Sequence, residues 1–182
     1  MPKRARFSTF DLLLVSLFSA LIIVARLAFR FPLKIPGRSG LSWMAIVVVA
    51  LGIVPKLGAG SLIGLFTALL AVLLGMGDKG AIYTFFSYLS LGVVADLVAW
   101  FLGDVSKPVT GALVGGLGNA AKSLTKTTVA WILGIPTGFV AFGALAAFGT
   151  NLAFGIVGGL LGSMILRGLE KAGFFAYLSE KR

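Results

Sequence analysis

Apolar runs of about 20 residues recur along the whole chain of 182 residues, and they constrain its fold more than any other feature. A helix needs about 20 predominantly apolar residues to cross the hydrocarbon core of a bilayer. The chain is 58% hydrophobic and only 12% charged, whereas soluble domains carry about 25% charged residues. The pattern therefore predicts an all-α membrane protein rather than a soluble globular core.

We expect a single integral membrane domain over residues 1–182, built as a bundle of six transmembrane helices with both termini in the cytoplasm. The spans are predicted at residues 9–29, 41–54, 58–76, 81–102, 109–134 and 137–166. Most lysines and arginines then lie at cytoplasmic helix ends, where the positive-inside rule favours them. This placement accounts for most of the net charge of +10 without a nucleic-acid partner. The external loop at residues 30–40 is an exception, because it is also basic.

The fifth predicted span carries unusual polar residues near its middle: Asn119, Lys122, Ser123 and Lys126. On a helix these four side chains fall within about 100° of arc and share one face. A cation at the bilayer centre costs on the order of 2.5–3.5 kcal/mol on insertion scales. The two lysines therefore need a wet cavity, a counter-charge or an anionic ligand, so this face is predicted to form one wall of a polar site.

A binding site can be assembled around this face from the other predicted spans and loops. The fourth span supplies Tyr83 near its outer end, and the sixth supplies Asn151 near its middle. The external loops add Arg38 and Lys79. The predicted substrate-binding residues are thus Asn119, Lys122, Lys126, Asn151, Tyr83, Arg38 and Lys79. Such a pocket suits a small anionic or carboxylate-bearing solute with a flat ring.

Structural interpretations of the same residues stay open. Lys122 and Lys126 can pair with Asp96 or with backbone carbonyls, and Asn151 can form an ordinary interhelical hydrogen bond. Tyr83 is also expected as an interfacial aromatic, as are Trp43 and Trp100.

Enzymatic chemistry is not expected from this sequence. The chain contains no histidine and no cysteine, so the usual metal ligands and the usual neutral-pH acid–base group are missing. No nucleophile, zinc or phosphate-loop motif with the required spacing is present. We therefore predict a protein that is not an enzyme, with no metal site and no cofactor.

Two segments of the sequence carry a family likeness. They are IPGRSGLSWM at 35–44 and PKLGAGSLIGLFTALLAVLLGMGDKGAIYTFFSYLSLGVVADL at 55–97. Together with six Gly/Ala-rich spans and a proline-containing loop after the first span, they resemble the substrate-binding subunit (S component) of energy-coupling factor (ECF) transporters. The likeness is to the vitamin-type subgroup of prokaryotic members. Metal-transporting members of the family use an N-terminal histidine motif, and the lack of histidine here favours an organic solute.

The resemblance implies vitamin or precursor uptake across the prokaryotic cytoplasmic membrane, by a multi-pass subunit surrounded by lipid. Its implied partners are a small-molecule substrate, a transmembrane coupling subunit and two ATPase subunits. The family docks its coupling subunit on an Ala-x-x-x-Ala pair of the first helix, and the matching positions here are Ser16 and Ala20. The loop after the first span would act as a lid over the site.

Two other classes of function fit the composition. The chain can be a structural or assembly membrane protein whose lysines pair internally. It can also be a self-sufficient small carrier or channel that works without ATP. A binding subunit should bind solute saturably as an isolated chain, whereas an assembly protein should bind none. A self-sufficient carrier or channel should transport solute by itself in liposomes.

Overall fold

The computed structural model describes residues 6–28, 39–76, 80–132, 134 and 138–175; for residues 138–142 it describes the backbone alone. The described residues fold into helices joined by turns. These residues form six helices and no strand, which confirms the predicted all-α class. The helices are α1 (Thr9–Ala28), α2 (Gly40–Ile53), α3 (Ala59–Leu73), α4 (Ala81–Leu102), α5 (Pro108–Ile132) and α6 (Gly138–Lys171).

Three of the described helices are long and apolar enough to cross a membrane. They are α1, α4 and the Gly143–Lys171 part of α6. The apolar helices α2 and α3 are shorter, with 14 and 15 residues. The lengths and compositions of these helices are those of a membrane protein, and large apolar side chains such as Leu73 and Phe101 are exposed on the outside of the bundle.

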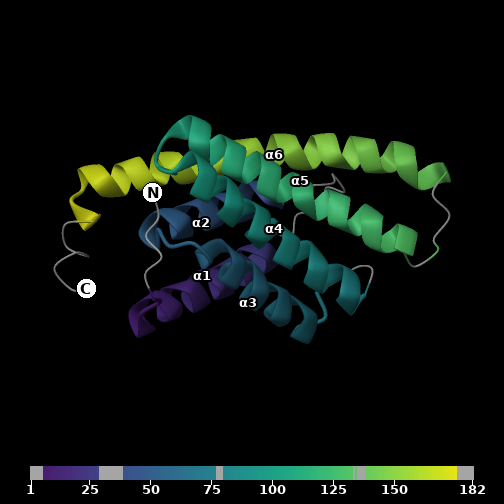
Figure 1. Cartoon of the computed structure of the whole chain (residues 1–182), viewed down its shortest axis with the longest axis horizontal. Helices are drawn as coiled ribbons and strands as arrows, with labels where there is room; N and C mark the ends of the chain where they lie inside the picture. The colour runs from purple at the N-terminus through teal and green to yellow at the C-terminus, as the bar shows by residue number, and fades with distance from the viewer. Residues whose placement is uncertain (1–5, 29–38, 77–79, 133, 135–137, 176–182) are drawn as a thin grey trace.

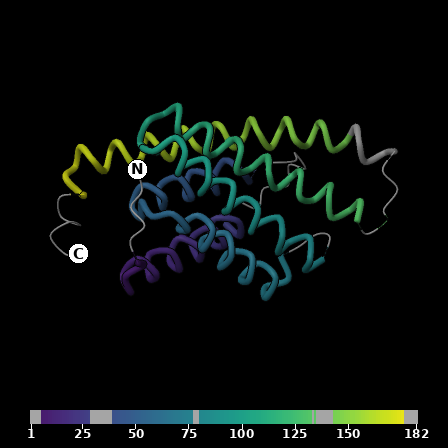
Figure 2. Tube along the Cα trace, viewed as in Figure 1, coloured from purple at the N-terminus to yellow at the C-terminus, as the bar shows by residue number. Residues whose placement is uncertain are grey.

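The helices lie side by side in a bundle, with α5 and α6 paired along one side and α1 and α3 on the other (Figure 1). The helix α4 packs between α3 and α5, and α2 packs against α1 and α6. Successive helices run back and forth, so that α1 begins and α6 ends at the same end of the bundle (Figure 2). The site described below takes residues from α1, α2, α3, α4 and α5.

Glycines bring two helix pairs into backbone contact. A Cβ atom added at Gly92 of α4 would lie 2.7 Å from the Cα atom of Gly64 in α3. One added at Gly115 of α5 would lie 2.8 Å from the Cα atom of Gly159 in α6. Small residues at such positions let helix backbones approach closely in a bilayer. Gly64 and Gly115 are thus packing residues at these two helix contacts.

A partly buried ion pair fixes the start of α1 to the turn between α2 and α3. The Asp11 carboxylate is 2.5 Å from the Lys56 ammonium. Asp11 also accepts hydrogen bonds from the Ser8 backbone N–H and hydroxyl, each at 2.9 Å. Ser8 and Asp11 thus satisfy the first backbone donors of the helix reciprocally, as a capping box does.

The α4–α5 turn is held against α6 by several hydrogen bonds. The Ser163 hydroxyl of α6 donates to the Val105 carbonyl at 2.8 Å, and Arg167 donates to the Ser106 carbonyl at 3.1 Å. Burial raises the pKa of Asp104 in this turn, but hydrogen bonds from Ser106 and the charges of Lys107 and Arg167 outweigh it. The net pKa therefore lies below its ordinary value, and the turn is stabilised by an ionised Asp104.

Candidate solute-binding site

Lys122 of α5 is inside the bundle and lies against aromatic rings. Its side chain is 8% exposed. The ammonium is 3.8 Å from the centre of the Trp43 ring of α2 and 5.6 Å from that of Tyr88 of α4. The electron-rich face of an aromatic ring attracts a cation, most strongly where water is excluded. This contact offsets part of the cost of holding a charge in the interior.

Arg26, near the end of α1, approaches the same two rings. Its guanidinium carbon is 5.6 Å from the Trp43 ring centre and 5.9 Å from that of Tyr88. Arg26 also donates hydrogen bonds to the Tyr88 hydroxyl and, at 2.5 Å, to the Met76 carbonyl. Two cations from helices far apart in the sequence, α1 and α5, therefore meet at one aromatic pair.

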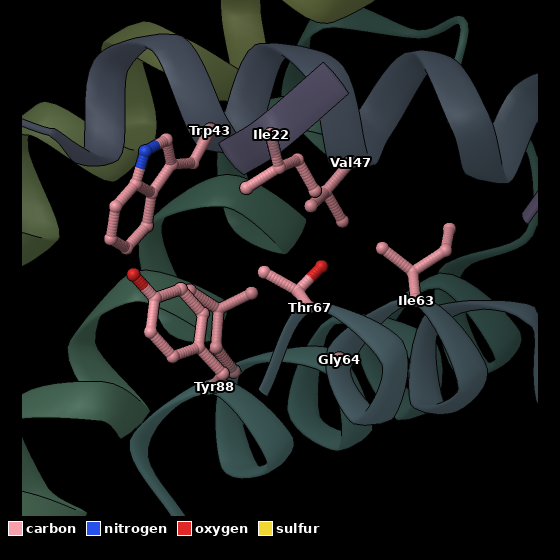
Figure 3. A pocket seen from close by; sticks show the side chains of 8 residues that line it. Ile22, Trp43, Val47, Ile63, Gly64, Thr67 and Tyr88 are labelled. Atoms are coloured by element: carbon pink, nitrogen blue, oxygen red, sulfur yellow. The ribbon is translucent and has the colours of Figure 1, made fainter. Parts of the chain in front are cut away.

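The two rings form one wall of a small apolar cavity. The centres of Trp43 and Tyr88 are 5.0 Å apart, with the rings tilted by 33°. The cavity continues past them to Ile22, Val47, Ile63 and Thr67, as Figure 3 shows. Its volume is about 10 Å³, near the lower limit for one water molecule.

The Thr67 hydroxyl is a polar atom in the wall of this apolar cavity. Thr67 is buried, and its hydroxyl has no hydrogen-bond partner among the described residues. The indole N–H of Trp43 is likewise buried and unpartnered within the described chain. Buried polar groups are nearly always hydrogen-bonded in proteins. Each of these two groups can therefore serve a bound molecule.

Asn119 and Asn151 join three helices near the cationic cluster. The Asn119 amide donates to the Asn151 backbone carbonyl at 2.7 Å, which links α5 to α6. The Asn119 side chain also lies where a Cβ atom of Gly40, at the start of α2, would be. Its side-chain oxygen has no hydrogen-bond partner in the described part of the chain. The Asn151 amide donates back to Ala147 of its own helix at 2.7 Å.

The remaining predicted site residues do not all gather here. Lys126 lies one turn beyond Lys122 on α5 and is exposed, whereas Tyr83 is buried in the first turn of α4. The Tyr83 hydroxyl has no hydrogen-bond partner among the described residues. Arg38 and Lys79 lie outside the residues that the structure describes, as does nearly all of the predicted lid.

Asp96 has a different role from the suggested pairing with the lysines. Its carboxylate accepts hydrogen bonds from the backbone N–H groups of Gly58 and Gly60 at 2.7 and 3.3 Å, and from the Ser61 hydroxyl at 3.0 Å. These donors belong to the beginning of α3, where backbone N–H groups have no partner within the helix. Asp96 thus caps a neighbouring helix.

Two residues of the cluster were not predicted as site residues. The expectation that Trp43 is an interfacial aromatic is wrong, because Trp43 is 2% exposed and packs inside the bundle. In the sequence, Arg26 lies near the end of the first apolar run, where cations commonly flank a membrane-spanning helix. Its position four residues after Ile22, on the face that packs inward, is the only sequence signal that points to the cluster.

Ser16 and Ala20 lie together on the exposed face of α1. The Ser16 hydroxyl donates to the Leu12 carbonyl of its own helix at 2.9 Å. Its hydrogen is therefore already used within α1. Leu13, Leu17 and Val24 surround the pair and are also exposed. This face is apolar, with two small side chains at its centre.

No protein-family model, curated protein or solved structure matches the chain.

Proposed function

We propose that the chain is the substrate-binding membrane subunit of an ECF-type importer. It captures a small organic solute, a vitamin or precursor with an anionic group, from outside the cell. A transmembrane coupling subunit and two ATPase subunits then drive its delivery. The observation that carries the proposal is the meeting of Lys122 and Arg26 at the Trp43–Tyr88 ring pair inside the bundle.

The arrangement of polar groups supports a site for an anion better than it supports a conduction path. Arg26 and Lys122 approach the same ring pair, and the two rings form one wall of a small apolar cavity. A site of this kind fixes a ligand by a few polar groups within apolar walls. The exposed face around Ser16 and Ala20 offers a separate surface where a partner helix can pack closely.

A structural or assembly protein is the second candidate, and the Asn119–Asn151 hydrogen bond favours it. Polar bonds between helices hold bundles together in lipid without any ligand, typically at about 1 kcal/mol each. On this alternative the isolated chain binds no solute, and replacing Lys122 disrupts the fold.

Native mass spectrometry of the chain purified gently from its own host tests the proposal. We expect a bound small anion, together with the coupling subunit and the ATPases. The Lys122→Gln variant should lose the bound molecule while its unfolding temperature stays close to that of the parent. An empty but well-folded chain without these partners would favour the assembly alternative. Transport by the chain alone in liposomes would identify a self-sufficient carrier.

The docking face has its own variants. Ser16→Leu and Ala20→Leu should abolish co-purification of the coupling subunit and leave the bound solute in place, because bulky side chains prevent close helix approach. Ala146→Leu, at a position on α6 that is also exposed, is the control and should leave the complex intact. Loss of the partner in the control as well would show that added bulk anywhere disturbs the assembly.

A further inference from the structure

Arg26 connects the end of α1 to other helices of the bundle. Its guanidinium donates hydrogen bonds to the Tyr88 hydroxyl of α4 and, at 2.5 Å, to the Met76 carbonyl in the turn after α3. The guanidinium carbon also lies 5.6 Å from the centre of the Trp43 ring of α2. A guanidinium presents its N–H donors in one fixed plane, so a single side chain can hold two acceptors and contact a ring at once. One residue therefore ties α1 to α2, α4 and the turn after α3.

The Met76 carbonyl is a firmly placed acceptor, because the chain around it forms a Schellman motif at the end of α3. The Met76 N–H donates to the Ala71 carbonyl at 2.9 Å, and the Gly75 N–H donates to the Val72 carbonyl at 3.0 Å. Gly75 has a φ of 61°, the left-handed conformation that this motif requires and that glycine adopts without strain. The acceptor is therefore fixed relative to α3, and Arg26 links α1 to that helix through it.

Arg26 also lies beside the cavity beneath the Trp43–Tyr88 pair. Both rings line the cavity, and so does Ile22, one helical turn before Arg26 on α1. All eight residues that line the cavity are buried, whereas Arg26 is partly exposed. Arg26 thus lies at the boundary between the enclosed cavity and the exterior of the bundle.

Thr67 is a polar member of the cavity wall that the closed arrangement leaves without a partner. Its side chain lies near Ile22, Val47 and Ile63 in Figure 3, and its hydroxyl has no hydrogen-bond partner among the described residues. An unpartnered buried hydroxyl costs free energy that contact with water recovers. The cavity of about 10 Å³ is near the lower limit for one water and has mostly apolar walls. The Thr67 hydroxyl therefore favours a more open state, and the contacts of Arg26 oppose it.

We propose that Arg26 is a latch. Its hydrogen bonds to Met76 and Tyr88 hold the Trp43–Tyr88 pair over the cavity, and their release admits water as far as Thr67. The inference goes beyond the proposed function, because it assigns a conformational device to α1–α4 and needs no solute. For a binding subunit, this latch would hold the closed state from which the bundle opens.

The test measures how fast a water-soluble reagent reaches Thr67. The chain has no cysteine, so Thr67→Cys provides a single thiol in the cavity wall. Its rate of labelling by a small methanethiosulfonate in detergent reports the population of the open state. Arg26→Met removes the donors and the charge but keeps a long side chain. We expect it to raise the labelling rate about tenfold, equivalent to about 1.4 kcal/mol, close to the contribution of one hydrogen bond to a charged group.

Further variants separate the parts of the latch. Tyr88→Phe removes one acceptor and keeps the ring, so it should raise the labelling rate by a smaller factor than Arg26→Met. Arg26→Lys keeps the charge but loses the planar set of donors, and it should also give a smaller increase. Lys171→Met is the control, because it removes a cation from the last turn of α6, which supplies no residue to the cavity. It should leave the rate unchanged.

A second reporter distinguishes release of the latch from general loosening of the bundle. Val48→Cys places a thiol at a fully buried position of α2 that packs against Gly162 of α6. Arg26→Met should leave the labelling rate of this reporter unchanged. An equal increase at both reporters would overturn the latch. An unchanged rate at Thr67→Cys would do the same, as would a Thr67→Cys chain with Arg26 intact that reacts as fast as the exposed Lys171→Cys.

None of these results bears on the importer assignment. Native mass spectrometry tests that assignment separately, through the co-purified solute and coupling subunit. A chain that carries both but shows no effect of Arg26→Met would retain the proposed function and lose the latch. A chain that carries neither but shows the expected labelling would retain the latch and lose the proposed function.

Discussion

Asp96 is a buried carboxylate on α4 whose hydrogen-bond donors all belong to the start of α3 among the bonds described above. Replacing Asp96 by Ala leaves the N–H groups of Gly58 and Gly60 without their acceptor. A buried polar group that loses its partner costs about 1–3 kcal/mol. We therefore expect Asp96→Ala to lower the unfolding temperature clearly, as measured by thermal unfolding in detergent. Asp104→Ala, at an exposed acidic residue in the α4–α5 turn, should lower it less.

Equal losses in the two variants would mean that Asp96 contributes no more than a surface carboxylate. Solute binding gives a second readout, because Asp96 lies at the other end of α4 from Tyr83. A folded Asp96→Ala chain should retain the binding affinity of the parent.

Single residues of the site differed in how far the sequence could predict them. Lys122 was predictable because a charge within an apolar run is costly, and its polar neighbours repeat at helical spacing. Trp43 was not, because tryptophan is typical both of membrane interfaces and of buried ring contacts. Arg26 was hidden for a similar reason, since a cation at a helix end is ordinarily solvated. Only the packing of α1 against α2 and α3, which brings the Arg26 side chain to Tyr88 of α4, distinguishes these cases.

The glycine contacts between helices carry a prediction at the level of elements. Gly92→Ala adds a Cβ atom 2.7 Å from the Cα atom of Gly64, and backbone cannot yield as a flexible side chain does. Overpacking of this kind costs about 1–3 kcal/mol, more than the roughly 1 kcal/mol of helix propensity that alanine gains over glycine. We expect a lower unfolding temperature for Gly92→Ala.

Gly149 of α6 offers the matched control. Open space surrounds the position of its missing Cβ atom. Gly149→Ala should therefore leave the unfolding temperature unchanged or raise it slightly, through helix propensity alone. If both alanine variants behave alike, the α3–α4 contact is looser than the distances indicate.

Helices were the most predictable elements, because each apolar run is bounded by glycine, proline or charged residues that end it. The pairing of the helices was less accessible. Gly64 and Gly115 are recognisable as packing residues, but nothing in the sequence says that they meet Gly92 and Gly159 in particular. Partner choice depends on the complementary shape of two whole faces, which the spacing within one helix does not specify.

At the scale of the whole molecule, six crossings with both termini on one side remain to be tested. The chain has no cysteine, so single cysteines report topology without background. We expect Lys107→Cys and Lys171→Cys to react with an impermeant maleimide only in inside-out vesicles. Ile132→Cys, at the opposite end of α5 from Lys107, should react only in right-side-out vesicles.

Labelling of positions 107 and 132 from the same side would mean that α5 does not cross the membrane. A prelabelling step with permeant maleimide is the control for each variant, because it shows that the cysteine is reactive at all. The positive-inside rule supports the expected orientation, with the basic loop predicted at 30–40 as the exception.

The polarity of α5 has a consequence for how the protein is made. This helix is the least hydrophobic of the six, and the insertion machinery selects spans by hydrophobicity. The partners of its polar and glycine-rich face, Asn151 and Gly159, lie on α6, the helix that follows it in the chain. We therefore expect α5 and α6 to enter the bilayer together as a hairpin. The polar face of α5 would then be covered by α6 before it meets lipid.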